Sequence, residues 1–353
     1  MSGTQRRSVI LGTGSELPAK VVTNRDLEKM VDTSDEWITV RTGIKERRVL
    51  EAGKGNADMA FQAAKRALAD AGMEATDLDA IIMGTVSADY LMPSSACVLE
   101  DMLGARNVFS FDVGAACSGF LNALSVADSF VRTGKINNAL VVGSDTLSRW
   151  LNWQDRGTCI LFGDAAGAVV LGPSENGSGI LSTKLRTDGS YVKTLYVPAG
   201  GSLKPATPGT VQRNEHTITM NGKEVFKIAV RSMEEISRQA LAEAGVAVEQ
   251  VSLVVPHQAN RRIIVALAER LGVPMERVMV NLEKYGNTSA ASIPVALDEA
   301  KRQGRIKPGD IVLLNAFGAG FAWGAAVIKF SPGELRRFLA GLAAHDLLRG
   351  RFT

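Results

Sequence analysis

The sequence predicts an α/β fold made of two similar halves, and two observations support this prediction. Segments with helical periodicity alternate with short, continuously apolar segments that are typical of buried strands. The chain also resembles itself at an offset of 173 residues (240 − 67): ALADAG at 67–72 returns as ALAEAG at 240–245, and LDAIIMG at 78–84 lies over VSLVVPH at 251–257. Ordered self-similarity of this kind indicates a duplicated unit.

Each half is predicted to begin its core with an amphipathic helix. In the first half the apolar residues follow helical spacing. They are Ala60, Ala63, Ala64, Ala67, Leu68 and Ala71. Because alanine is small, such faces allow the close packing that a helix sandwiched between two sheets would require. A buried strand, a loop and a helix entered through glycine are expected to follow in each half.

The repeat continues toward the C-terminus. Residues 133–145 resemble 303–316, and residues 163–172 resemble 320–330, where both segments read G-x-x-x-G-A before a strand. The uncharged run at 311–328 reaches the lower edge of transmembrane length. Its glycines and one asparagine interrupt it, so it is interpreted as two buried strands around a glycine turn.

The two halves are expected to span 1–180 and 181–330, and a C-terminal extension follows at 331–353. Apolar residues in this extension have helical spacing, with arginines opposite, and therefore predict a short amphipathic basic helix. They are Leu335, Phe338, Leu339 and Leu342. This helix could pack on its own subunit, or it could contact a partner or a membrane surface.

The composition is that of an ordinary soluble globular protein, with 46% hydrophobic and 22% charged residues among 353. The net charge of +3 is too small to suggest a nucleic-acid partner. No apolar core of a secretory signal follows the N-terminus, so a cytoplasmic location without a membrane span is expected. The three cysteines, Cys97, Cys117 and Cys159, are too few and too scattered for a disulfide framework or a zinc site, and no metal is expected.

Cys117 is the first candidate for chemistry. It follows Gly114, Ala115 and Ala116 and precedes SGFLNAL, which predicts a helix entered by a tight turn. A helix N-terminus lowers the pKa of a thiol, and the resulting thiolate is a nucleophile. The alternative is that Cys117 is a small buried core residue, which free cysteines often are.

His257 and Asn287 are the next candidates. At the offset of 173, Gly84 falls on His257, and Cys117 falls on Ala290, three residues after Asn287. Such positions face each other across a pseudo-twofold axis, so the three side chains are expected to converge on one cleft. A neutral amide beside a neutral imidazole favours stabilisation of a developing oxyanion or enolate. The alternatives are a core histidine and a helix-capping asparagine.

The glycine-rich segment at 317–324 supplies the remaining part of the predicted site. Glycines allow the backbone to approach the thiol closely. The amides near Ala319 and of Cys117 itself are predicted to form an oxyanion hole. The segment could equally be a turn between two strands, and the two interpretations are compatible.

Six stretches together resemble one known family. DVGAACSGF, VVPHQANRRII, YGNTSAAS and FGAGFAWGAAVIKF occur in this order, together with TSDEWITVRTGIKERR at 33–48 and DRGTCILFGDAAGAVVL at 155–171. They closely resemble β-ketoacyl-acyl carrier protein synthase III, over about residues 8 to 330. The resemblance implies a thiolase-like αβαβα five-layered fold with two pseudo-symmetric halves, and a homodimer.

The resemblance also implies a reaction. Cys117 would take an acyl group from acyl-CoA, which is a substrate, so that no separate cofactor is needed. Malonyl-acyl carrier protein would then lose carbon dioxide, with the enolate held by His257 and Asn287. The carbanion would attack the Cys117 thioester to give a 3-oxoacyl carrier protein, the first condensation of type II fatty acid synthesis.

Residue roles follow from the same resemblance. Trp37 and Arg156 would sandwich the CoA adenine, with Thr33 and Arg41 in the same binding region. Phe317 would promote decarboxylation through its apolar face.

The basic residues Lys227, Arg262 and Arg270 would meet the acidic carrier protein. For Arg270, a role on a solvated helix face is an equal alternative. Met92 stands where the family bounds the acyl pocket across the dimer, and its flexible thioether leaves the acyl chain length open.

Three other functions are compatible with parts of this pattern. One is a related thiolase-fold synthase of secondary metabolism, similar to a type III polyketide synthase or an acyltransferase. Another is a cysteine hydrolase, because papain-like enzymes use Cys, His and Asn in the same chain order. The third is a non-catalytic carrier-binding protein, which the three filled reactive positions disfavour.

Overall fold

The computed structural model describes residues 6–174 and 176–330, so the helix predicted at 331–353 lies outside the described residues. The strands are β1 (Arg7–Glu16), β2 (Val21–Thr23), β3 (Glu46–Arg48), β4 (Ala80–Gly84), β5 (Phe109–Val113), β6 (Ala139–Thr146), β7 (Asp164–Ser174), β8 (Gly179–Thr187), β9 (Leu195–Tyr196), β10 (Thr219–Met220), β11 (Leu253–Pro256), β12 (Ile311–Gly318) and β13 (Ala322–Lys329). The α-helices are α1 (Asn24–Glu28), α2 (Asp35–Thr42), α3 (Asn56–Ala71), α4 (Ser95–Leu103), α5 (Gly119–Arg132), α6 (Pro208–Gln212), α7 (Gly222–Ala244), α8 (Arg261–Leu271), α9 (Leu282–Tyr285) and α10 (Ser292–Arg302).

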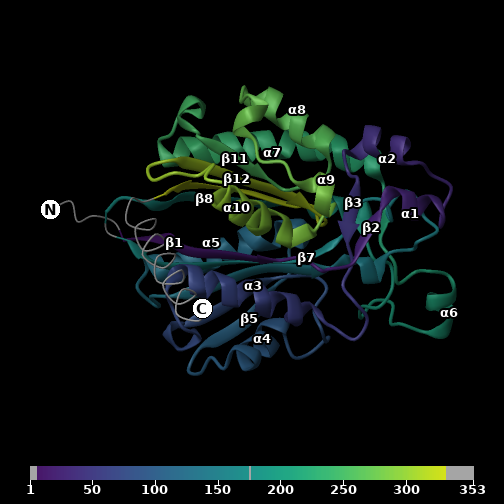
Figure 1. The fold of residues 1–353 in the computed structure, drawn as a ribbon, viewed down its shortest axis with the longest axis horizontal. Helices are drawn as coiled ribbons and strands as arrows, with labels where there is room; N and C mark the ends of the chain where they lie inside the picture. The colour runs from purple at the N-terminus through teal and green to yellow at the C-terminus, as the bar shows by residue number, and fades with distance from the viewer. Residues whose placement is uncertain (1–5, 175, 331–353) are drawn as a thin grey trace, which may run out of the picture.

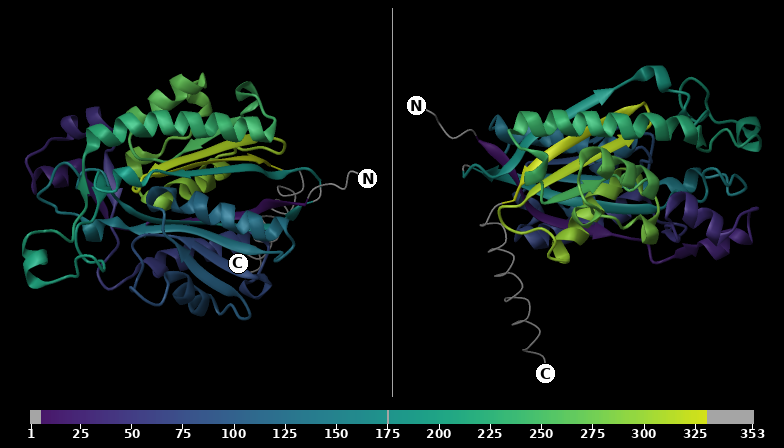
Figure 2. Two further views of the ribbon diagram at one scale, coloured as in Figure 1. Left: turned by 180° about the vertical axis from the view of Figure 1, so that it is seen from behind. Right: turned by 90° about the horizontal axis from the view of Figure 1, so that it is seen from above.

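The chain forms five layers, as predicted (Figure 1). One sheet has the strand order β1-β7-β6-β4-β5, and the other has the order β11-β12-β13-β8. Helices α5 and α10 lie between the two sheets, α3 and α4 cover the outer face of the first, and α7 and α8 cover the outer face of the second (Figures 1 and 2). The predicted αβαβα arrangement is therefore confirmed.

The sequence repeat corresponds to a repeat of structure. Helices α5 and α10 begin at Gly119 and Ser292, again 173 residues apart (292 − 119). Each follows a short 3-10 helix, Ala116–Ser118 or Ser289–Ala291, whose first residue has a left-handed backbone with φ of 46° or 52°. The halves differ at β5, because α9 occupies the corresponding place in the second half and that sheet has one strand fewer.

The segment 311–328 forms two antiparallel strands, β12 and β13, as predicted. Among the described residues, no helix combines the length and the apolar character that crossing a membrane would require. The strands of the first sheet end at Ser174, and those of the second begin at Gly179. The division of the chain at 180 stays a prediction.

Small residues bring β1 and α3 into close contact. The predicted alanine face of α3 is fully buried against the first sheet. A Cβ atom at Gly12 or Gly14 of β1 would overlap with backbone atoms of Ala63, Ala67 or Ala71. The strand can therefore lie directly on the helix only because β1 has no side chains at these two points and the facing residues of the helix are alanines.

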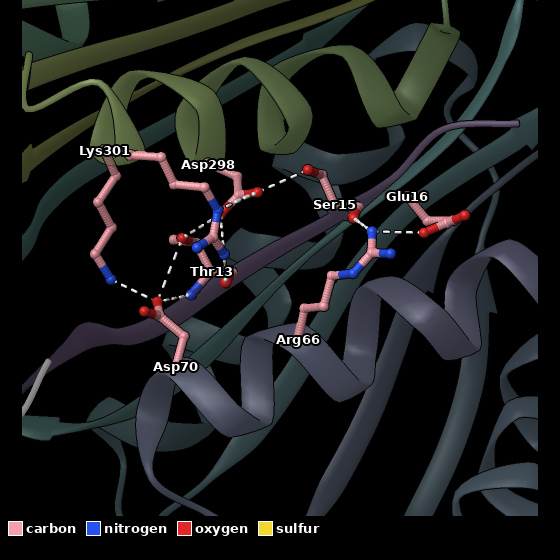
Figure 3. A network of polar contacts seen from close by, with 8 residues as sticks. Thr13, Ser15, Glu16, Arg66, Asp70, Asp298 and Lys301 are labelled. Atoms are coloured by element: carbon pink, nitrogen blue, oxygen red, sulfur yellow. Dashed lines mark hydrogen bonds and ion pairs between the residues drawn. The ribbon is translucent and has the colours of Figure 1, made fainter. Parts of the chain in front are cut away.

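A buried polar network joins α10 of the second half to β1 and α3 of the first half (Figure 3). Asp298 of α10 accepts hydrogen bonds from the hydroxyls of Thr13 (2.8 Å) and Ser15 (2.6 Å) on β1. Asp70 of α3 accepts a bond from the Thr13 backbone N–H (2.7 Å) and pairs with Lys301 of α10 (2.6 Å). These contacts fix the orientation of α10, whose N-terminal end lies in the candidate site.

Replacing Asp298 by alanine should destabilise the protein strongly. The carboxylate is 2% exposed and also pairs with the half-exposed Arg302 at 3.0 Å, so its removal leaves the hydroxyls of Thr13 and Ser15 without this acceptor and Arg302 without its ion pair. Leaving buried hydrogen-bonding groups without their partner costs about 1–3 kcal/mol. Urea unfolding should show this loss for Asp298→Ala. Asp101→Ala, which breaks an exposed pair with Arg106, should cost about 1 kcal/mol or less. Equal, small losses for both variants would contradict the role assigned to the network.

Candidate active site

One cavity of about 670 Å³ is lined by Cys117, His257 and Asn287 together. Cys117 comes from the first half of the repeat, and His257 and Asn287 come from the second. The expected convergence of these three side chains on one cleft is therefore seen in the structure. Phe317, at the end of β12, lines the same cavity and is 4% exposed.

Cys117 lies in the short 3-10 helix that leads into α5. The left-handed backbone of Ala116 turns the chain sharply before it. A Cβ atom at Gly318 would lie only 2.7 Å from the Cys117 backbone nitrogen, so the glycine-rich turn after β12 approaches the nucleophile as closely as predicted. The result is a thiol that is 6% exposed and is reached through the cavity.

The pKa of Cys117 differs from the sequence-based prediction. The pKa of the thiol is raised to about 12: burial is the main cause, a hydrogen bond with Ser289 opposes it, and the charge of the nearby Asp145 adds to it. The prediction that the helix start lowers this pKa is wrong for this state, because loss of water outweighs the helix dipole. The thiol is protonated at neutral pH, and its proton must leave when the sulfur attacks.

His257 follows the buried strand β11, which runs parallel to β12. Its backbone N–H donates to Asn315 on β12 (2.8 Å), and its ring Nδ1 lies 2.6 Å from the Ser292 hydroxyl. Burial lowers the pKa of His257 to about 3. The imidazole is therefore neutral, and its buried Nε2 has no hydrogen-bond partner among the described residues.

Asn287 is held by its backbone and oriented by its side chain. Its N–H donates to Leu161 (2.7 Å), and its C=O accepts from Gly163 (3.0 Å). Its side-chain Oδ1 accepts the N–H of Ser289 (2.9 Å). Because Oδ1 is engaged in this way, the Nδ2 amide group is free to donate into the cavity.

The arrangement is suited to thioester chemistry. A thiol can form a covalent acyl intermediate. Two neutral N–H donors, from His257 and Asn287, can stabilise negative charge on a substrate oxygen without being titrated near neutral pH. Among the residues that line this cavity there is no carboxylate to act as a general base.

The mouth of the cavity carries the residues predicted to bind CoA. Two guanidinium groups lie near the indole of Trp37, that of Arg41 4.3 Å and that of Arg156 5.1 Å from the centre of a ring. A base stacked between Trp37 and Arg156 needs about 7 Å, two contacts of about 3.5 Å. Arg156 would therefore have to move from its ion pair with Asp32 (3.2 Å). Thr33 does not line the cavity, and its buried hydroxyl has no partner among the described residues.

The three predicted carrier-binding residues differ in their surroundings. Arg262 lines the mouth of the cavity, with its guanidinium 5.5 Å from the centre of the Phe226 ring. Lys227 is exposed on α7 and does not line the cavity. Arg270 lies in the last turn of α8 and forms an ion pair with Glu234 of α7 (2.9 Å). Its charge is therefore partly neutralised within the chain.

A second cavity of about 420 Å³ lies on another side of Cys117. Its lining is almost entirely apolar. The lining residues include Val86, Leu147, Trp150, Phe162, Val192, Ile218 and Ala319. Met92 does not line it from the same chain and is 85% exposed, so a role as a gate requires a second copy.

Two residues that organise the site, Asp145 and Ser292, were not predicted from the sequence. Asp145, at the end of β6, is fully buried and accepts bonds from the loop that follows β4 and from the Ala290 N–H (3.3 Å). Ser292 contacts His257. The signal that could have indicated Ser292 is its place in the repeat, where it falls on Gly119, two residues after Cys117.

Among the described residues, no group of three metal-binding side chains is found.

Comparison with known proteins agrees with these features. Residues 111–189 match the family described as 3-oxoacyl-[acyl-carrier-protein (ACP)] synthase III, and residues 241–330 match its C-terminal part. The β-ketoacyl-[acyl-carrier-protein] synthase III of Caldanaerobacter subterraneus subsp. tengcongensis is 54% identical over 91% of this chain and 97% of its own length.

Two crystal structures of such synthases superpose on most of the chain. The enzyme from Aquifex aeolicus is 51% identical, with a TM-score of 0.85 over 92% of this chain and 100% of its own. The enzyme from Thermus thermophilus is 43% identical, with a TM-score of 0.86 over 92% of this chain and 99% of its own.

The raised pKa predicts how Cys117 reacts with alkylating agents. Because only the thiolate reacts, the rate of alkylation by iodoacetamide should rise about tenfold per pH unit from pH 7 to pH 10 without reaching a plateau. Mass spectrometry of the Cys117 peptide measures this rate, and Cys117→Ser shows the labelling of the other two cysteines. A plateau below pH 9 would show that the helix start does stabilise the thiolate in the free protein.

Proposed function

Because the chain belongs to the β-ketoacyl-[acyl-carrier-protein] synthase III family, the condensing acyltransferases that start fatty acid synthesis, we propose that Cys117 takes an acyl group from acyl-CoA and transfers it to malonyl-acyl carrier protein. The observation that carries this proposal is the junction of two cavities at the Cys117 thiol, one with a basic mouth and one apolar. The related synthases of secondary metabolism and the cysteine hydrolases are not favoured, because synthases III match 91% of the chain at about half identity.

The first half-reaction forms the acyl-enzyme. Cys117 loses its proton, and its sulfur attacks the carbonyl carbon of acyl-CoA. The amides of Cys117 and Ala319 are the proposed donors to the resulting oxyanion. The C–S bond to CoA then breaks, and the CoA thiolate takes up one proton, which balances the proton that Cys117 released. The acyl chain would occupy the apolar cavity, whose volume of about 420 Å³ accommodates groups larger than acetyl.

The second half-reaction forms the carbon–carbon bond. The malonyl group loses carbon dioxide, and the electron pair of the broken bond moves into an enolate. His257 and Asn287 donate to the enolate oxygen, for which their neutral N–H groups are suited. The apolar ring of Phe317 disfavours the ionised carboxylate and so favours its loss. The enolate carbon attacks the thioester, the C–S bond breaks, and the Cys117 thiolate that leaves takes up a proton from water to restore the thiol.

Substrate contacts at the cavity mouth follow from the same scheme. Trp37 and Arg156 stack on the CoA adenine after Arg156 moves, and Arg41 and Thr33 belong to the same region. Acyl-CoA is a substrate, and no separate cofactor is proposed. A cytoplasmic location is consistent with these substrates.

We also propose a homodimer formed through the edge of the first sheet. In the described part of the chain, β5 pairs only with β4 and leaves one edge open. In the segment between β4 and α4, Leu91 is 99%, Met92 85% and Tyr90 61% exposed, so three consecutive large hydrophobic side chains face the solvent. A second copy would cover them and would bring Met92 to the partner's acyl cavity.

Two substitutions separate the half-reactions. Cys117→Ser should abolish acyl loading, which intact-mass analysis after incubation with a panel of acyl-CoAs measures. His257→Ala should load normally but lose condensation by about 100- to 1,000-fold, the usual cost of one oxyanion donor. Condensation at the unmodified rate by His257→Ala would contradict the assigned role. Hydrolysis of acyl-CoA without condensation by the unmodified protein would favour a hydrolase.

The expected contributions of Lys227, Arg262 and Arg270 to binding of the carrier protein can be ranked by whether each residue already forms an ion pair within the chain. Lys227→Ala and Arg262→Ala should raise the KM for malonyl-acyl carrier protein several-fold, more at low salt than at high salt. Arg270→Ala is the matched control, because its charge is already paired with Glu234, and it should change this KM less than twofold. Lys227→Ala should leave the KM for acyl-CoA unchanged, since Lys227 does not line the cavity. An equal effect of all three variants would refute the ranking.

A further inference from the structure

Ser292 is a buried residue to which the proposed mechanism assigns no role. It is the first residue of α10 and is 2% exposed. Its Oγ lies 2.6 Å from Nδ1 of His257, which is itself 2% exposed. Helix α10 thus contacts the His257 imidazole at Nδ1, whereas the other ring nitrogen, Nε2, has no partner among the described residues.

The hydrogen-bonding partners of these two atoms decide where the imidazole proton lies. A neutral imidazole carries one proton, on Nδ1 or on Nε2. In the described part of the chain, Nδ1 and the Ser292 hydroxyl have only each other as partners. If Nδ1 carried the proton, the buried Ser292 O–H would have no acceptor, which costs free energy. If the hydroxyl donates to Nδ1, both groups are satisfied and the proton lies on Nε2.

The second nitrogen faces the chemistry. Nε2 of His257 is buried without a partner, and His257 lines the cavity together with Cys117 and Asn287. Asn287 directs its Nδ2 group into the same cavity, because Ser289 occupies its Oδ1. A backbone amide therefore orients one donor, and a serine hydroxyl orients the other.

We propose that Ser292 is a positioning residue, whose hydroxyl donates to Nδ1 of His257 and so keeps the imidazole proton on Nε2, facing the substrate oxygen. The assignment of the proton rests on the hydrogen bonds alone. The identity of the substrate oxygen, that of the enolate, rests on the proposed function.

The choice of serine has a chemical consequence. A carboxylate at this place would raise the proton affinity of the imidazole and make Nε2 a base. A neutral hydroxyl leaves the imidazole a neutral donor. The site is therefore suited to a second substrate that generates its own carbanion by losing carbon dioxide, and unsuited to removing a proton from an unactivated acyl-CoA.

The unmodified protein tests the proton assignment directly. The chain has only three histidines, His216, His257 and His345, so long-range ¹H–¹⁵N spectra of ¹⁵N-histidine-labelled protein can be assigned with His257→Asn. We expect the spectrum of a neutral imidazole protonated on Nε2 for His257, unchanged from pH 6 to pH 9. A proton on Nδ1 would overturn the proposal, whatever the activity of the protein.

A substitution tests the effect on the reaction. Ser292→Ala should load the acyl group on Cys117 at the unmodified rate but condense about 10-fold or more slowly, up to the 100- to 1,000-fold loss of removing an oxyanion donor. Its His257 signals should also show a mixture of tautomers. Ser182→Ala is the matched control, since Ser182 is a buried serine that donates to Ala240 outside the site. Condensation by Ser292→Ala at the rate of Ser182→Ala would refute the proposal. If the unmodified protein loads but does not condense, the proposed function fails, whereas the spectra still decide the proton assignment.

Discussion

The structure depends on close backbone packing where the two halves meet. The segments that begin α5 and α10 lie against each other there, and three glycines leave room for them. A Cβ atom at Gly143 of the first half would overlap with the backbone of Ala290 in the second half, and one at Gly84 would overlap with the backbone of Gly119 within the first half. Without these contacts Cys117 would not lie beside His257 and Asn287. The repeat pairs Gly84 with His257 and Cys117 with Ala290, so at each pair one half supplies the packing and the other supplies the reactive group.

Burial then determines the charge states of the site. It keeps the Cys117 thiol protonated and the His257 imidazole neutral, because both charged forms lose water in the same cavity. An ion pair between thiolate and imidazolium, as in many cysteine hydrolases, is therefore not favoured in this state. Neutral N–H donors have the opposite advantage, since they stabilise a transient oxyanion strongly where water is excluded. The same low polarity that delays the first proton transfer favours the later decarboxylation.

Local sequence patterns predicted the elements whose determinants are local. The alanine spacing of α3 and the glycine interruptions between β12 and β13 correctly indicated a helix and two strands. The repeat correctly predicted that Cys117, His257 and Asn287 converge on one cavity. The predicted direction of the Cys117 pKa shift was wrong, because the shift depends on close packing against Gly318 and on the charge of Asp145, which are distant in sequence. Likewise, Arg270 resembles a free basic residue in sequence, but Glu234, on a different helix, neutralises its charge.

Asp145 shows how the two halves are coupled near the nucleophile. One carboxylate oxygen accepts bonds from the backbone of Val86 (2.9 Å) and the hydroxyl of Ser87 (2.7 Å), and Val86 lines the apolar cavity. The other oxygen accepts the N–H of Ala290, in the segment that orients Asn287 and leads into Ser292. If a bulky acyl chain displaced Val86 in the wall of the apolar cavity, the Asp145 carboxylate would be displaced as well. The same carboxylate also binds Ala290, in the segment between Asn287 and Ser292. Because a buried carboxylate is costly to leave unpaired, it resists such displacement. One side chain thus contacts both the loop at the apolar cavity and the segment that carries the donors.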